Sequence, residues 1–112
     1  MSRYKIKITE LAEQDLENIG DYISNGLLNP LAATNTVWGI LRKINSLERY
    51  PERNCLDSDI ILAEQGVRAI YYKDYKIFYI IENTVIYVVR ILHTRTDSKS
   101  RLYAAFSNPK GN

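Results

Sequence analysis

The sequence is poor in the residues that build disulfides, metal centres and phosphate-binding loops. Its 112 residues include one cysteine, Cys55, and one histidine, His93. A single cysteine cannot close an internal disulfide, and neither residue has companions at metal-ligand spacing. The five glycines are scattered and never approach the spacing of a phosphate-binding loop. We therefore predict no metal ion and no cofactor, and we expect Cys55 to be a small residue of a loop or core.

Long apolar runs are also missing. No segment approaches the roughly 18 apolar residues of a membrane span, and the opening MSRYKIKITE lacks the apolar stretch of a signal peptide. We therefore expect a cytoplasmic protein with no membrane partner. Hydrophobic residues at 46% and charged residues at 25% are typical of a globular chain. We predict one domain over residues 1–112, with a single core and a tail frayed over residues 107–112.

No charge of one sign dominates the chain, whose net charge is +2. Residues 1–65 hold seven Lys/Arg and ten Asp/Glu, a net charge of −3, whereas residues 66–112 hold eight and three, a net charge of +5. Such asymmetry is typical of a surface that meets phosphates or an acidic protein segment. Solvated lysines along a sheet are the simpler alternative.

The first quarter of the chain predicts a strand and a helix. Charged and apolar residues alternate over residues 3–8, which is the period of a strand with one buried face. Thr9 then offers an N-cap hydroxyl, and Glu10 and Glu13 place negative charge in the first helical turn, where the helix dipole favours it. Apolar residues recur every three or four positions from there, so we expect this helix to run to about Ser24.

A second helix is predicted to begin at Pro30, with Asn29 as its cap. Its apolar stripe recurs at helical spacing until Tyr50, where the following proline stops it. Trp38 lies next to the stripe residue Val37. We expect this tryptophan to be a core anchor between the helices rather than a platform for a ligand.

The second half of the chain predicts a sheet. Residues 52–66 are polar and unpatterned, which favours a surface connection with room for a short strand or turn. The runs VRAIYY, YKIFYII and VIYVVRIL then predict three strands, and only tight hairpins fit between them. A short helix is expected in the tail. The predicted fold is α+β, in the order β-α-α-β-β-β, with a helical hairpin packed on one face of an antiparallel sheet.

Standard catalytic motifs are absent, and the single histidine could join a Ser/His/Asp triad only through a geometry that sequence proximity does not supply. Cations are the more informative feature. Arg68, Lys76 and Arg90 interrupt the three apolar strands, and Arg95 follows the last one. Burying such cations unpaired is costly, so they either face solvent or a partner, or they form internal ion pairs.

Four motifs occur in a fixed order along the chain. They are A-x-x-D-L at Ala12–Leu16, G-x-R at Gly66–Arg68, Y-x-I-x-Y at Tyr75–Tyr79 and R-I-L-H-x-R-x-D at Arg90–Asp97. Together they resemble the RelE/ParE superfamily of toxins from bacterial type II toxin–antitoxin modules. The resemblance runs from Tyr4 to about residue 102 and implies the element order predicted above.

The resemblance leaves the activity open among three alternatives. The long helix pair and the ending ILHTRTDSKSRL are more similar to ParE-like members, which poison DNA gyrase and have no agreed catalytic set. RelE-like members instead cut messenger RNA on the translating ribosome without a metal ion, and that chemistry would assign catalytic roles to His93, Arg95 and Lys76. The lysine pair that RelE carries on the preceding strand falls here near Val67 and Ala69, which are apolar. The third alternative is an inactive relative that only binds an antitoxin. Whether the chain is an enzyme depends on this choice.

The resemblance also implies partners. A plasmid-stabilisation or related module supplies a cognate antitoxin, whose C-terminal segment wraps the toxin. DNA gyrase or the ribosome with its message would be the target, and a toxin dimer or a toxin–antitoxin hetero-oligomer is left open. Contacts to the target or the antitoxin are implied at six residues: Arg68, Lys76, Arg90, Arg95, Arg101 and Tyr103. Within this set Arg90 lies inside a strand between apolar neighbours, which favours a structural role, whereas Arg95 follows the strand and is the better candidate for target contact, together with His93.

Overall fold

The computed structural model describes residues 4–96 and Leu102. A four-residue strand, β1 (Lys5–Ile8), leads into two long helices, α1 (Glu10–Asp21) and α2 (Pro30–Asn45). A short helix α3 (Ile60–Glu64) and the strands β2 (Arg68–Tyr72), β3 (Tyr75–Glu82) and β4 (Val85–His93) follow. The predictions made for the tail helix, Arg101 and Tyr103 lie outside the described residues.

The sheet has the strand order β1-β4-β3-β2. Strands β2, β3 and β4 form the two predicted antiparallel hairpins, whereas β1 pairs with β4 in parallel. The α+β fold and its element order are confirmed, and the parallel pair makes the sheet mixed. Hairpin turns impose antiparallel pairing on neighbouring strands, but β1 is separated from β4 by the helices and two further strands, a connection long enough to permit either direction.

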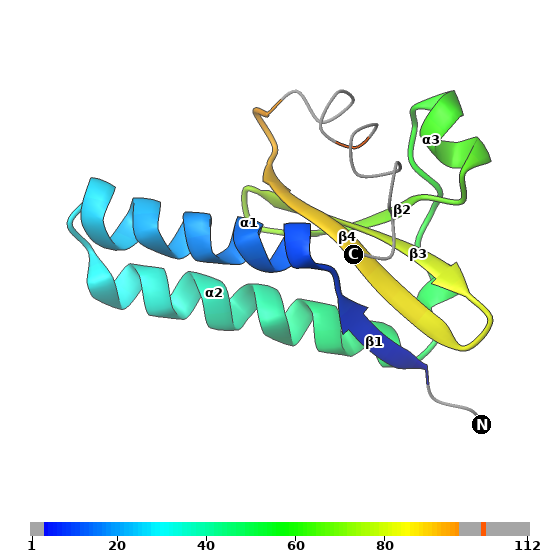
Figure 1. The fold of residues 1–112 in the computed structure, drawn as a ribbon, viewed down its shortest axis with the longest axis horizontal. Helices are drawn as coiled ribbons and strands as arrows, with labels where there is room; N and C mark the ends of the chain where they lie inside the picture. Colours follow the sequence, from blue (N-terminus) through cyan, green and yellow to red (C-terminus); the bar gives the residue numbers. More distant parts are fainter. Residues whose placement is uncertain (1–3, 97–101, 103–112) are drawn as a thin grey trace.

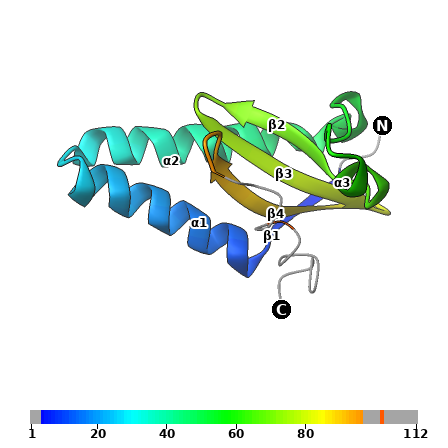
Figure 2. The same ribbon diagram turned by 90° about the horizontal axis from the view of Figure 1, so that it is seen from above.

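Both helix starts are capped as predicted. The Thr9 hydroxyl accepts a hydrogen bond from the Ala12 N–H at 3.3 Å, and the Asn29 side chain accepts one from the Ala32 N–H at 3.2 Å. Each bond satisfies a backbone donor that the first helical turn leaves without a partner. A π-helical turn at Tyr22–Gly26 ends the first helix. The joined ends of α1 and α2 project beyond the sheet (Figures 1 and 2).

The sheet buries apolar residues on both faces, so the expected single core is in fact two clusters. The helix-side core lies between the sheet and the helical hairpin and comprises Ala12, Ile40, Ile44, Leu47, Ile70, Ile77, Tyr79, Ile86, Val88 and Ile91. The far-side core lies on the opposite face and comprises Leu62, Val67, Phe78, Val89, Leu92 and Leu102. Helix α3 supplies Leu62 to this second cluster. The predicted polar connection therefore holds a helix that covers the far face (Figure 2).

Trp38 is not a core anchor, because 58% of its surface is exposed. The sequence placed it beside Val37, but neighbouring residues on a helix point about 100° apart. The buried residues of α2 are Ala33, Gly39, Ile40 and Ile44. Trp38 thus faces away from the sheet.

Candidate target-contact site at the end of strand β4

A hollow of about 440 Å³ lies between α1 and the ends of strands β3 and β4. Apolar atoms of Ile19 and Ile91 form part of its wall. Its polar groups come from separate elements: Asn18 and Tyr22 from the end of the first helix, Tyr75 from β3, and His93 and Arg95 from the end of β4. We call Tyr22, Tyr75, His93 and Arg95 the β4-end site.

His93 has a defined orientation. Its Nδ1 accepts a hydrogen bond from the Arg95 backbone N–H at 3.1 Å, so the neutral ring carries its proton on Nε2. The ring meets Tyr75 edge to face, with centroids 5.4 Å apart at 84°. His93 also lines a second hollow of about 130 Å³ beside Lys76 and Phe78. Its side chain therefore lies in the wall between two depressions.

The phenol of Tyr75 stays protonated at neutral pH. Burial raises its pKa above the ordinary value of 10.0, and the negative charge of Asp74 acts in the same direction. A neutral phenol donates a hydrogen bond but does not act as a base. The β4-end site thus offers the phenol of Tyr75 as a hydrogen-bond donor, the imidazole of His93 and the guanidinium of the exposed residue Arg95. These groups suit recognition of an acidic or polar group.

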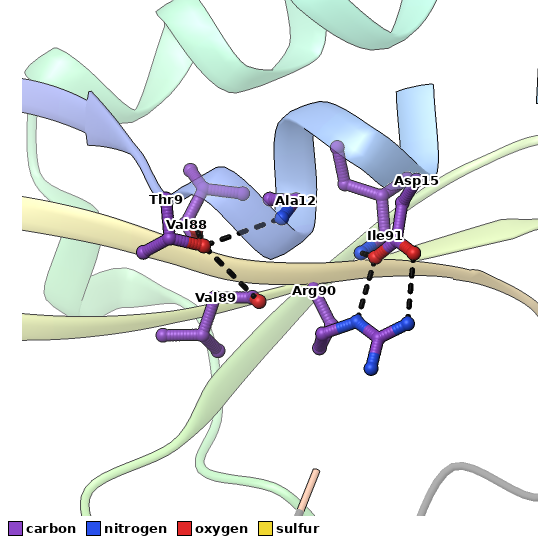
Figure 3. A network of polar contacts seen from close by, with 7 residues as sticks. All are labelled: Thr9, Ala12, Asp15, Val88, Val89, Arg90 and Ile91. Carbon is purple, nitrogen blue, oxygen red and sulfur yellow. Dashed lines mark hydrogen bonds and ion pairs between the residues drawn. The ribbon is translucent and has the colours of Figure 1, made fainter. Parts of the chain in front are cut away.

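Arg90 is locked inside the protein rather than presented to a partner. Its Nε and Nη2 atoms each donate to the Asp15 carboxylate at 2.8 Å, and both residues are 8% exposed (Figure 3). The same carboxylate accepts a third hydrogen bond from the Ile91 N–H at 2.9 Å. A bidentate pair of this kind fixes geometry as well as charge. This burial fits the structural role that its position within the strand favours, and its contact with a target or an antitoxin stays a prediction.

The Asp15 contacts have a topological reason. Strand β1 pairs only with Val85–Val88, so within residues 4–96 the rest of the β4 edge has no neighbouring strand. The start of α1 takes the place of that strand (Figure 3). The Thr9 hydroxyl donates toward the Val88 and Val89 carbonyls at 3.0 and 3.3 Å. Farther along the same edge, the Asp15 carboxylate accepts a hydrogen bond from the Ile91 N–H. The side chains of α1 thereby satisfy backbone groups that would otherwise be buried without partners.

Lys76 is held by an ion pair on the far face of the sheet. Its Nζ lies 3.0 Å from the Asp57 carboxylate, and the side chains are 20% and 4% exposed. The ammonium also lies 4.8 Å from the centroid of the Phe78 ring and 5.6 Å from that of Tyr71. Both ring contacts are within the range of cation–π attraction. Lys76 thus ties the connection before α3 to the sheet.

Arg68 supports the same connection from the other face. Its Nη1 donates to the backbone carbonyls of Asn54 at 2.6 Å and Glu52 at 3.2 Å. Nearby, the Tyr79 hydroxyl donates to the Pro51 carbonyl at 2.7 Å. Each of the three strand cations is therefore engaged within the chain, which is the internal pairing that the sequence left open beside exposure to solvent or a partner. Of the predicted site residues that the structure describes, His93 shares one hollow with Arg95 and the second hollow with Lys76.

Sequence reasoning missed Asp15, Asp57 and Tyr22 as participants. Asp15 had a signal, because it is the acid of the A-x-x-D-L motif and falls one residue before an apolar stripe position. The pairing of Asp57 depends on how a loop without periodicity folds, and no local pattern predicts that. Among residues 4–96 and Leu102, no three His, Cys, Asp or Glu side chains gather as a metal site. No helix in that described part is long and apolar enough to span a bilayer.

Three solved structures share this architecture. A protein of the chromosomal ParDE toxin–antitoxin system of P. aeruginosa superposes with a TM-score of 0.69 at 21% identity, over 81% of this chain and 96% of that one. The toxin RelE of E. coli, in a mutant free state, gives 0.63 at 14% identity, over 94% and 96% of the two chains. The RelBE2 toxin–antitoxin complex of Mycobacterium tuberculosis gives 0.57 at 21% identity, over 81% and 98%. A search of curated proteins by sequence finds no match.

The sheet, the helical hairpin and these likenesses define the fold of the RelE/ParE superfamily of toxins. Within it, the chain belongs to the family described as the ParE toxin of the type II toxin–antitoxin system parDE, whose sequence model matches residues 6–98. The suspected superfamily and its ParE-like branch are both confirmed.

Proposed function

We propose that the protein inhibits DNA gyrase in the cytoplasm and that a cognate antitoxin neutralises it. Family membership supports a toxin, and the state of the strand cations supports the choice of target. Lys76, Arg68 and Arg90 are all held by intramolecular contacts. A metal-independent nuclease would use such cations to stabilise the negative charge of the phosphate in the transition state. Here these cations are instead engaged in contacts within the fold.

The alternative, cleavage of ribosome-bound message, draws its support from the β4-end site. His93 could move a proton and Arg95 could stabilise charge on a phosphate, as general acid–base chemistry requires. Lys76 lines the neighbouring hollow but is neutralised by Asp57. The Asp57 carboxylate therefore offsets the positive charge that Lys76 would offer to a phosphate. We therefore rank gyrase inhibition first.

The antitoxin is proposed to contact cations that the fold leaves at the surface. Lys5 and Lys7 are exposed on the edge strand β1, and Arg95 is exposed beyond β4. An acidic antitoxin segment that runs along this edge would add backbone hydrogen bonds to β1 and place carboxylates beside these residues. Arg101 and Tyr103 stay proposals of the sequence alone.

Induced expression of the chain without an antitoxin tests the activity. We predict filamentous cells in which DNA synthesis stops while incorporation of labelled amino acids continues. Immediate arrest of amino-acid incorporation would instead identify a ribosome-dependent nuclease, and normal growth with full-length protein present would identify an inactive relative. Co-expression of the neighbouring open reading frame should restore growth if it encodes the antitoxin.

A further inference from the structure

A groove runs along the outer seam of the helical hairpin, away from the β4-end site. One part, of about 380 Å³, is lined by Gly20 of α1 and by Ser24 of the π-helical turn that follows this helix. Helix α2 contributes the rest of the lining: Pro30, Ala33, Thr34, Val37 and Trp38. An adjoining part, of about 410 Å³, is lined by Leu16, Glu17, Gly20, Asp21 and Val37. The two parts share Gly20 and Val37 and so form one depression, which we call the outer groove.

The floor of the outer groove is low because Gly20 has no side chain. A Cβ at this position would lie 3.5 Å from Val37 Cγ2, so the two helices are in close contact there. Small and apolar residues at a helix seam leave space for the side chains of a third helix. The floor is thus shaped for helix packing.

Thr34 and Trp38 of α2 line one wall of the outer groove, and Leu31 extends that wall along the same helix beyond the lining residues. Leu31, Thr34 and Trp38 follow one another at spacings of three and four, so they share a helix face. Leu31 is 71% exposed and Trp38 is 58% exposed. This second apolar stripe lies outside the stripe that packs on the sheet. A large exposed tryptophan beside a groove is typical of a protein-binding surface.

Glu17 and Asp21 of α1 line the opposite wall, and they belong to an acidic ridge that runs along that helix. Glu10, Glu13, Glu17 and Asp21 recur at three and four residues, and all four are exposed. The helix contains no Lys or Arg, and neither do the residues that line the outer groove. An apolar floor with one apolar wall and one acidic wall is complementary to a helix that carries an apolar stripe flanked by Lys or Arg.

We infer that the outer groove binds a basic amphipathic helix of a partner protein. Apolar residues of that helix lie over Gly20 and against Trp38, and its Lys or Arg residues face Glu17 and Asp21. A second copy of this surface fits poorly, because the acidic wall would meet either another acidic wall or an apolar one. The inference concerns a different surface from the proposed gyrase activity and holds or fails independently of it.

Trp38 gives a direct readout, because it is the only tryptophan of the chain. The test uses the full chain and two designed helical peptides of about 14 residues, long enough to hold a helix. Both carry leucines at helical spacing, and they differ only in whether lysine or glutamate flanks the leucines. We expect the lysine peptide to shift Trp38 emission to shorter wavelength and to bind at least about tenfold more tightly than its glutamate twin at low salt. Equal binding of both peptides, or of neither, would overturn the inference.

Charge-reversed variants sharpen the test. Replacing both Glu17→Lys and Asp21→Lys should invert the preference between the two peptides, while the matched control Glu64→Lys, on exposed α3, should leave it unchanged. Trp38→Ala, followed by anisotropy of a labelled lysine peptide, should weaken binding at least about tenfold. Leu31→Asp is a second variant of the same wall with the same expected loss. Sedimentation equilibrium completes the design, because self-association that Trp38→Ala abolishes would assign the groove to a second copy and refute a basic partner.

Discussion

Removing the Asp15 carboxylate is expected to be among the most costly single substitutions in this chain. In Asp15→Ala the buried guanidinium of Arg90 loses two hydrogen bonds of 2.8 Å, and the Ile91 N–H loses its acceptor at 2.9 Å. Breaking a buried ion pair by deleting one partner costs about 3–5 kcal/mol. Arg90 has a further interaction, so we expect the lower end, about 3 kcal/mol. At about 4 °C per kcal/mol, the melting temperature should fall by about 12 °C.

Urea unfolding followed by circular dichroism measures this loss. Glu17→Ala is the matched control, since it removes an exposed acid from the same helix and should change the free energy of unfolding by less than about 0.5 kcal/mol. Arg90→Met combined with Asp15→Leu should recover most of the stability lost in Asp15→Ala, because no buried charge is left behind. A loss below about 1 kcal/mol for Asp15→Ala would refute the assignment of this pair as the clamp between α1 and β4.

Three further predictions concern other parts of the molecule. Gly39→Ala should destabilise the fold by about 1–3 kcal/mol in urea unfolding, because the new Cβ would lie 2.1 Å from the Tyr72 ring. Gly20→Ala is the control: its Cβ would meet only an ordinary contact, so this variant should be neutral or stabilising. Equal losses of stability in the two variants would contradict this prediction. Burial raises the pKa of Tyr79 above 10.0, so the unfolded chain releases this proton first and stability should fall as pH rises above 10.0, less steeply in Tyr79→Phe. Arg95→Ala should abolish growth inhibition with an unchanged melting curve, and a lower melting temperature would make this exposed residue structural.

Local chemistry explains why the helices and hairpins were predictable. The capping hydroxyl of Thr9 and the capping amide of Asn29 predict where the two helices begin, and the structure contains both caps. The turns at Lys73 and Asn83 leave room for only two residues, which fixes antiparallel neighbours. These signals lie within a few residues of the structure they specify.

Long-range placement explains what the sequence could not supply. The parallel pairing of β1 depends on where the chain lies after the helical hairpin. The exposure of Trp38 depends on which side of α2 packs against the sheet. The cations Lys76 and Arg90 find their acids 19 and 75 residues away in the chain. Alternation along a strand identifies the face of a residue only after the register is known, and β4 contains an irregularity opposite Phe78 and Tyr79. The β4-end site was therefore only half predicted, through His93 and Arg95.

Because the fold holds its strand cations in internal contacts, we propose that the toxin acts on gyrase rather than on messenger RNA. The most direct test incubates the purified chain with gyrase and supercoiled plasmid, and in parallel with translating ribosomes on a defined message. We predict accumulation of gyrase-linked cleaved DNA and an intact message. Message cut within the ribosomal A site, with gyrase activity unaffected, would contradict this account.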